Sequence, residues 1–211
     1  MNKTIKTTIA IVVGIIIAIL LFLAFTSVKN EEAAKTNLNI NNEEDLTTLV
    51  DKIYAGVSIE MPNLMTQTID KTDADAVKTF TGLDSSDNLE YIVASEPMMS
   101  SQAYSLVLVK AKEGTDVDTI AKTMNENINE RKWICVSAEK IYTTTSGNII
   151  CLVMTNQETA KSVFESFKTL AGTTGKVYER AEETLEMPED MLFEDNSETP
   201  NTSSDEANFM E

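Results

Sequence analysis

The stretch from 129 to 154 gathers the side chains with the most evident capacity for chemistry. It reads NERKWICVSAEKIYTTTSGNIICLVM and holds the only tryptophan, Trp133, and both cysteines, Cys135 and Cys151. An indole can stack on a ligand or a cation, and two thiols can form a disulfide in an oxidising compartment. The stretch is therefore either a chemical site or a packed corner of a small domain.

The spacing of the two cysteines argues against a disulfide. If Ser146 and Gly147 form a two-residue hairpin loop, Tyr142 lies opposite Cys151. Cys135 then lies about 23 Å further along at 3.3 Å per residue. A disulfide needs Cα atoms within about 7 Å, and no CxxC redox spacing is present. We therefore expect Cys151 to be a small core hydrophobe.

Trp133 follows Arg131 and Lys132 at the predicted end of a helix. Basic side chains there complement the helix dipole, and the indole can cover the edge of the core. We therefore interpret the stretch as packing. The alternative is a pocket for a small ligand around Trp133 and Tyr142, which makes both of them candidate binding residues.

Composition excludes several classes of activity. The chain has 211 residues and no histidine, which removes the commonest general base and metal ligand. Its 17 basic and 34 acidic residues give a formal net charge of −17. Such a charge repels phosphate backbones, so we expect no nucleic-acid partner. We predict a non-enzymatic chain without a cofactor or a catalytic metal.

Methionine pairs offer a second kind of chemistry. Met98 with Met99, and Met61 with Met65, present thioethers that could bind copper(I). Methionine more often fills gaps in a core, and we favour that interpretation. Met98 and Met99 are still candidate binding residues, because they lie in the EPMMSSQ connection between two predicted strands.

Three carboxylates allow a hydrolase as a further alternative. Glu90, Glu96 and Glu139 could cut a glycosidic bond if two of them stood about 5 to 9 Å apart. Charged surface residues are abundant in this chain, so we rank a cell-wall hydrolase below a binding domain.

Residues 9–28 predict a transmembrane helix. They read IAIVVGIIIAILLFLAFTSV without a charge, and about 20 residues cross a hydrocarbon core. The apolar run from Ile9 to Phe25 exceeds the roughly 7 to 15 residues of a cleaved signal peptide, which is the alternative. We therefore expect an integral membrane protein with a single span.

The flanking charges predict the orientation of that span. Lys3 and Lys6 precede it, whereas Lys29 after it is offset by Glu31 and Glu32. Because positive residues stay inside, residues 1–8 are expected in the cytoplasm and residues 29–211 outside the cell membrane.

The part after the span divides into three. Residues 29–42 are polar and aperiodic and predict a stalk. Residues 43–178 carry the apolar periodicity of an extracytoplasmic α+β domain. Residues 179–211 are strongly acidic and predict a disordered tail.

Within the domain, a strand–strand–helix unit is expected twice. The predicted elements are strands 89–95 and 103–111 with helix 116–131, then strands 140–144 and 149–154 with helix 157–170. A shift of 43 positions sets Leu106 on Ile149 and Ile120 on Val163, which suggests an internal duplication. The fold class is α+β, with an antiparallel sheet of about four strands and two amphipathic helices on one face. One or two further helices precede this unit, the first starting after an N-cap at Asn42.

Two blocks carry a resemblance to a known family. AYSLVLVKAKEGTDVDTIAKTM and RKWICVSAEK resemble a domain-of-unknown-function family of membrane-anchored proteins from anaerobic Gram-positive bacteria. The resemblance implies an anchor followed by a small extracytoplasmic α+β domain. It implies no reaction and no catalytic residue. A protein or cell-envelope component is therefore the expected partner.

Overall fold

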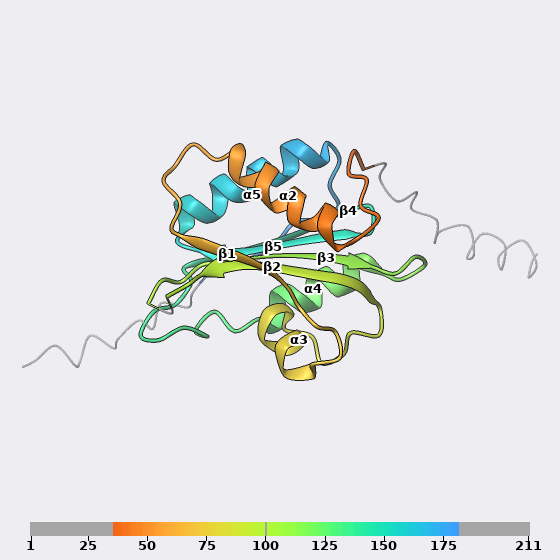
Figure 1. The fold of residues 1–211 in the computed structure, drawn as a ribbon, viewed down its shortest axis with the longest axis horizontal. Coiled ribbons are helices and arrows are strands. Elements are labelled where there is room, and N and C mark those ends of the chain that lie inside the picture. The colour runs from red at the N-terminus through yellow and green to blue at the C-terminus, as the bar shows by residue number, and fades with distance from the viewer. Residues whose placement is uncertain (1–35, 100, 182–211) are drawn as a thin grey trace, which may run out of the picture.

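The computed structural model describes residues 36–99 and 101–181 (Figure 1). The predicted cytoplasmic segment 1–8, the predicted span 9–28 and tail residues 182–211 lie outside the described residues. Within the described ranges, no helix combines the length and the apolar character needed to cross a bilayer.

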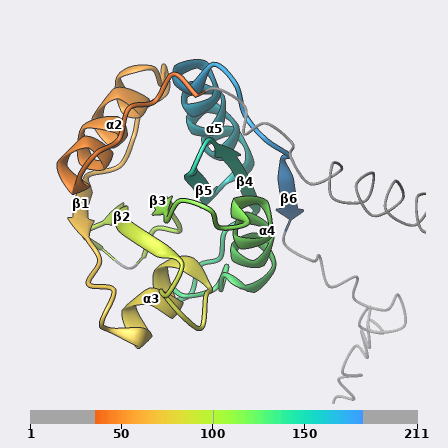
Figure 2. The same ribbon diagram turned by 90° about the vertical axis from the view of Figure 1, so that its right-hand side faces the viewer.

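A six-stranded antiparallel sheet lies between two pairs of helices (Figures 1 and 2). The strands in spatial order are β1 (Leu64–Thr68), β2 (Leu89–Pro97), β3 (Ser105–Ala111), β5 (Ile149–Thr155), β4 (Lys140–Ser146) and β6 (Tyr178–Ala181). The helices are α2 (Glu43–Ala55), α3 (Ala74–Thr81), α4 (Val117–Asn127) and α5 (Gln157–Ala171). Helices α2 and α5 cover one face, and α3 and α4 cover the other.

The α+β class with one antiparallel sheet is confirmed, but the expected strand number is wrong. The four predicted strands correspond to β2, β3, β4 and β5, and the two edge strands β1 and β6 were missed. β1 reads LMTQT and β6 reads YERA, and neither shows a clear apolar alternation. Edge strands are half solvated, so they carry little of the periodic signal from which strands are predicted.

The expectation that both repeated helices share one face is also wrong. α4 packs in the core with Val107 and Val109, whereas α5 packs in the core with Leu106 and Leu108. These alternate residues of β3 point to opposite faces of the sheet. The two strand–strand–helix units are therefore not related by a simple duplication. Helices cover both faces of the sheet.

Two ends of the domain can now be distinguished. The entry end is where the described chain begins: Thr36 Oγ1 lies at hydrogen-bond distance, 2.7 Å, from Ser146 Oγ, and Asn37 N donates to Ala171 O at 3.1 Å. The opposite, distal end carries the last residue of β5, Thr155, paired with the first residue of β4, Lys140.

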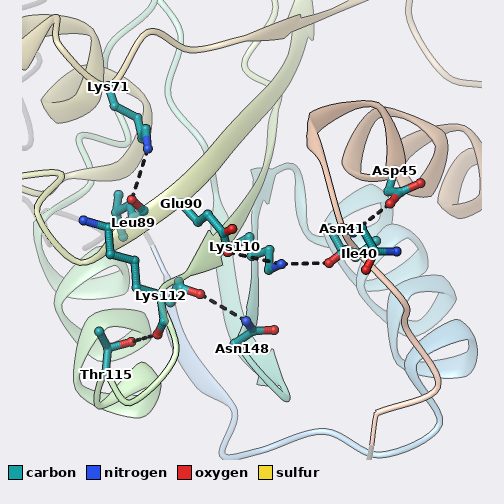
Figure 3. Close-up of polar contacts among 11 residues, drawn as sticks. Ile40, Asn41, Asp45, Lys71, Leu89, Glu90, Lys110, Lys112, Thr115 and Asn148 are labelled. Carbon is teal, nitrogen blue, oxygen red and sulfur yellow. Dashed lines mark hydrogen bonds and ion pairs between the residues drawn. The ribbon is translucent and has the colours of Figure 1, made fainter.

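Residues 36–42, expected to be the end of a stalk, pack onto the domain instead. Leu38 and Ile40 contact the core between α2, α5 and the sheet. The Ile40 carbonyl accepts a hydrogen bond from Lys110 Nζ at 2.8 Å (Figure 3). The domain therefore begins earlier than the polar composition suggested, and β6 extends it to Ala181.

Local signals explain most helix starts and the central turn. Asn42 caps α2 as expected, and its side chain accepts from Asp45 N. α4 begins after its N-cap Asp116 and ends at Asn127, four residues before the predicted end at 131. In the β4–β5 hairpin, Gly147 adopts a positive φ of 58° and Cys151 pairs with Thr144. The expected pairing of Cys151 with Tyr142 is thus wrong by two residues.

Phe167 offers a test of the α5 placement. Its side chain is fully buried between α5 and the sheet, so Phe167→Ala should lower the free energy of unfolding by roughly 3 to 5 kcal/mol. The exposed Lys161 on the same helix provides the control, and Lys161→Ala should leave stability unchanged. Urea unfolding followed by circular dichroism measures both, and an unaltered midpoint for Phe167→Ala would contradict the packing.

Candidate functional site

The exposed large apolar side chains gather at the distal end. Among the described residues they are Met65, Met98, Met99 and Ile134, with exposed fractions of 48%, 75%, 68% and 67%. Met65 pairs in the sheet with Glu96, and the next two methionines follow β2 directly. These four residues are called the distal rim below. Large apolar side chains grouped at one end of a domain are candidates for contact with another molecule.

An ion pair beneath the rim holds one of its loops. Lys132 Nζ lies 2.5 Å from Glu96 Oε1, and the two side chains are only 7% and 20% exposed. The ammonium also lies 4.9 Å from the centre of the Phe80 ring and 5.5 Å from that of Trp133. Burial lowers the pKa of Lys132, and Glu96 opposes that shift. The pair therefore fixes the α4–β4 loop, and Ile134 with it, against β2.

Sequence reasoning missed Lys132. It placed Lys132 in the last turn of a helix, but α4 ends at Asn127 and the chain turns back towards the sheet. Trp133 does pack partly buried against the core, which agrees with the packing interpretation. The cluster of Lys132, Glu96 and Phe80 could not be predicted from spacing, because its members lie far apart in the sequence.

A cavity of about 370 Å³ opens at the same end of the domain. Its polar lining includes Gln102, Ser137 and Thr159, together with two carboxylates, Glu60 and Glu139. Glu139 also accepts a hydrogen bond at 3.1 Å from the N–H of Gln157 at the start of α5. The cavity can therefore accept hydrogen-bond donors, and none of the described residues that line it is basic.

A buried tyrosine forms one wall of this cavity. Tyr104 is 2% exposed, and its hydroxyl donates to Tyr54 Oη at 3.0 Å. Burial raises the pKa of Tyr54 to about 12 and that of Tyr104 well above its ordinary value. Both phenols stay protonated at neutral pH, so the wall is a rigid, neutral support rather than a source of a general base.

The structure does not bring Trp133 and Tyr142 together. Trp133 packs on the α3/α4 side of the sheet. Tyr142 packs on the α2/α5 side, where its ring stacks on Phe164 with centroids 4.9 Å apart. A shared pocket around the two candidates is therefore not formed, although Trp133 lies beside the rim.

The carboxylates singled out from the sequence are also dispersed. Glu90 pairs with Lys110 at 3.1 Å, towards the entry end (Figure 3). Glu96 lies six residues along the same strand, about 20 Å away at 3.3 Å per residue. Glu139 lies at the start of α5, where it accepts a hydrogen bond from Gln157 N. Glu90 and Glu96 do not form the paired acids of a glycosidase.

The cysteines and methionines differ in their surroundings. Cys151 is fully buried opposite Leu108, as expected for a small core hydrophobe, and burial strongly raises its pKa. Cys135 is exposed with a positive φ of 59°, and both thiols are free. The favoured interpretation of Met98 and Met99 as gap-fillers is wrong, since both are exposed.

Metal ligation finds no support in the part of the chain that the structure describes. No group of three or more cysteine, aspartate or glutamate side chains there is placed to hold a metal ion. The distal end combines an apolar rim with an adjoining polar cavity.

The Lys132–Glu96 pair makes a testable contribution to stability. Glu96→Gln leaves a buried ammonium without its counter-charge, which should cost roughly 3 to 5 kcal/mol. The double variant Lys132→Met with Glu96→Leu should regain most of that loss, because an apolar pair needs no desolvation of charge. Asp84→Asn breaks the exposed Lys78–Asp84 pair and serves as the control, with no expected change. Equal urea midpoints for Glu96→Gln and the wild type would refute the assignment.

Comparison with known proteins gives one match. No curated protein and no solved structure matches the chain. The matching family covers β1 to β5, including α3, α4 and all four residues of the distal rim, whereas α2, α5 and β6 lie beyond it. The resemblance expected from the two sequence blocks is confirmed at this level. Residues 63–155 match the family described as a domain of unknown function, DUF4358.

Proposed function

We propose that this chain is a non-enzymatic, single-pass membrane protein whose α+β domain binds a protein or envelope component outside the cell. The N-terminus lies in the cytoplasm, residues 9–28 cross the membrane, and the distal rim makes the contact. The proposal combines the apolar segment and its flanking charges with the arrangement of the two ends of the domain.

One observation carries the proposal: the chain enters at one end, and the exposed apolar residues gather at the other. Thr36 lies beside Ser146 at the entry end, whereas Met65 pairs with Glu96 at the distal end. The seven residues of β5 separate these ends by about 20 Å. An anchor that precedes Thr36 holds the entry end towards the bilayer and leaves the rim facing away from it.

The chemistry of the rim suits a macromolecular partner. Methionine side chains are flexible and polarisable, so they adapt to an apolar surface that another protein presents. The buried Lys132–Glu96 pair keeps the loop of Ile134 in place before a partner arrives, which reduces the ordering cost of binding. The separation of Glu90 from Glu96 and the lack of histidine favour binding over hydrolysis.

The cavity supports a second candidate function, the recognition of a small polar ligand. Its volume of about 370 Å³ falls in the usual range for ligand sites. Glu60 and Glu139 favour a ligand that donates hydrogen bonds or carries a positive charge. Neither Trp133 nor Tyr142 lines this cavity. The ligand site is therefore different from the one predicted around those two residues.

Cys135 allows the orientation to be measured. It is exposed at the distal end while Cys151 is fully buried, so a membrane-impermeant maleimide should label intact cells at one thiol per chain. Cys135→Ser should abolish the labelling. Labelling that appears only after the cells are lysed would place the domain in the cytoplasm and overturn the proposed topology.

The rim can be tested by site-specific photo-crosslinking of the full-length chain in native membranes. A photoreactive residue at Met98 should yield a discrete crosslinked product, because this side chain is three-quarters exposed. The same residue at Lys112, towards the entry end, is the control and should give none. Ile134→Ser should weaken the product several-fold. Equal crosslinking from Met98 and Lys112, or none from Met98, would refute the rim as the contact surface.

A further inference from the structure

The outermost strand β1 presents unpaired backbone groups at the edge of the sheet. Ile69 N donates to Ile92 O at 2.9 Å, which marks these two residues as a hydrogen-bonded pair. In an antiparallel ladder such pairs alternate, so Met65 and Gln67 also bond to β2. The N–H and C=O groups of Leu64, Thr66 and Thr68 therefore point away from β2, and no hydrogen bond to another described residue engages them. Figure 2 shows this strand at one edge of the sheet.

β1 lacks the features that normally keep an edge strand unpaired. Proteins protect such edges with charged side chains, proline, bulges or covering elements. The sequence LMTQT carries no charge and no proline, and its pairing with β2 runs without a bulge from Leu64 to Thr68. The strand is therefore open to pairing with another extended segment.

The opposite edge strand, β6, has the protection that β1 lacks. Glu179 pairs with Lys140 at 2.8 Å, and Arg180 pairs with Glu130 at 2.7 Å. Asn125 of α4 also donates to the Tyr178 carbonyl, which covers part of that edge. The two edges of the sheet therefore differ in their side chains: charged residues protect β6, whereas β1 has none.

The exposed methionines surround the unguarded edge. Met65 belongs to β1 itself and is half exposed, and Leu64 pairs with Pro97, which directly precedes Met98 and Met99. An added strand would place alternate side chains beside Met65 and Gln67 on the α3/α4 side. An apolar or β-branched residue of the added strand fits beside Met65. A charged residue would find no opposite charge on β1.

We propose that β1 receives an extended segment of a protein partner as a seventh strand of the sheet, with an apolar side chain seated beside Met65. Backbone groups of Leu64, Thr66 and Thr68 supply the hydrogen bonds, and the methionines of the distal rim supply the apolar contact. This inference rests on the proposed function, because it names the kind of partner and the way in which it docks. It makes the partner an extended polypeptide rather than a glycan, which could not continue the ladder.

The orientation of Thr66 provides a selective variant. Its N–H points outward, so Thr66→Pro removes a donor for the added strand while the bonds between β1 and β2 remain. Thr66→Val is the matched control, since it also loses the 3.1 Å hydrogen bond from Thr66 Oγ1 to Ser95 Oγ but keeps the N–H. Met65→Lys, at a half-exposed position, gives a second variant that leaves the backbone unchanged.

The probe is a set of seven-residue peptides that alternate threonine with valine, leucine, phenylalanine or methionine. They are added to the full-length chain in detergent micelles, and amide hydrogen exchange is measured residue by residue. The outward amides of Leu64, Thr66 and Thr68 should gain at least tenfold protection. N-methylation of alternate peptide amides, Thr66→Pro and Met65→Lys should each weaken binding at least tenfold, whereas Thr66→Val should change it less than twofold.

The outcomes separate this inference from the proposed function. Protection confined to residues other than those of β1, binding indifferent to N-methylation, or no binding by any peptide of the set would overturn the added strand. If the crosslink from Met98 persists in Thr66→Pro, the rim still contacts a partner, but the partner does not pair with β1. If the crosslink is lost in Thr66→Pro and kept in Thr66→Val, both statements stand.

Discussion

The burial of β3 and β5 on both faces is the constraint on which the rest of the structure depends. Every residue of β5 is buried, and so are all residues of β3 except Lys110. A strand buried on both sides needs two separate apolar layers over it, and the domain provides them with α2 and α5 on one side and α3 and α4 on the other. The central strands cannot meet solvent or a partner. Contact with other molecules is therefore left to the sheet edges, the loop ends and the outer faces of the helices.

The same constraint explains where sequence reasoning succeeded. Long apolar runs in β3 and β5 and the one-sided stripe of α5 were predicted nearly to their ends, because burial of a whole stripe leaves a strong periodic signal. The covering of both faces could have been inferred from the unbroken run in β5, since a half-solvated strand alternates polar and apolar residues. The edge strands escaped because LMTQT and YERA contain no such pattern.

The candidate site was recovered only in part, because its properties depend on exposure and on contacts between distant segments. Met98 and Met99 were found as residues, but composition cannot tell an exposed methionine from a buried one. Lys132 and Glu96 lie far apart in the sequence, and their spacing does not predict an ion pair. The separation of Trp133 from Tyr142 by the sheet follows from the faces of the helices, which the sequence analysis had assigned incorrectly. The family matched by residues 63–155 has no known function, so the match assigns a role to no residue.

The docking of residues 36–42 along the domain decides where a soluble version of it must be cut. A fragment that starts at Glu43, the boundary suggested by polarity, would strip away Leu38 and Ile40 and uncover the apolar layer between α2 and α5. It would also remove the carbonyl that accepts from Lys110 and the amide that donates to Ala171. A recombinant fragment that begins at Thr36 or earlier keeps residues 36–42, and they cover the apolar layer at the entry end.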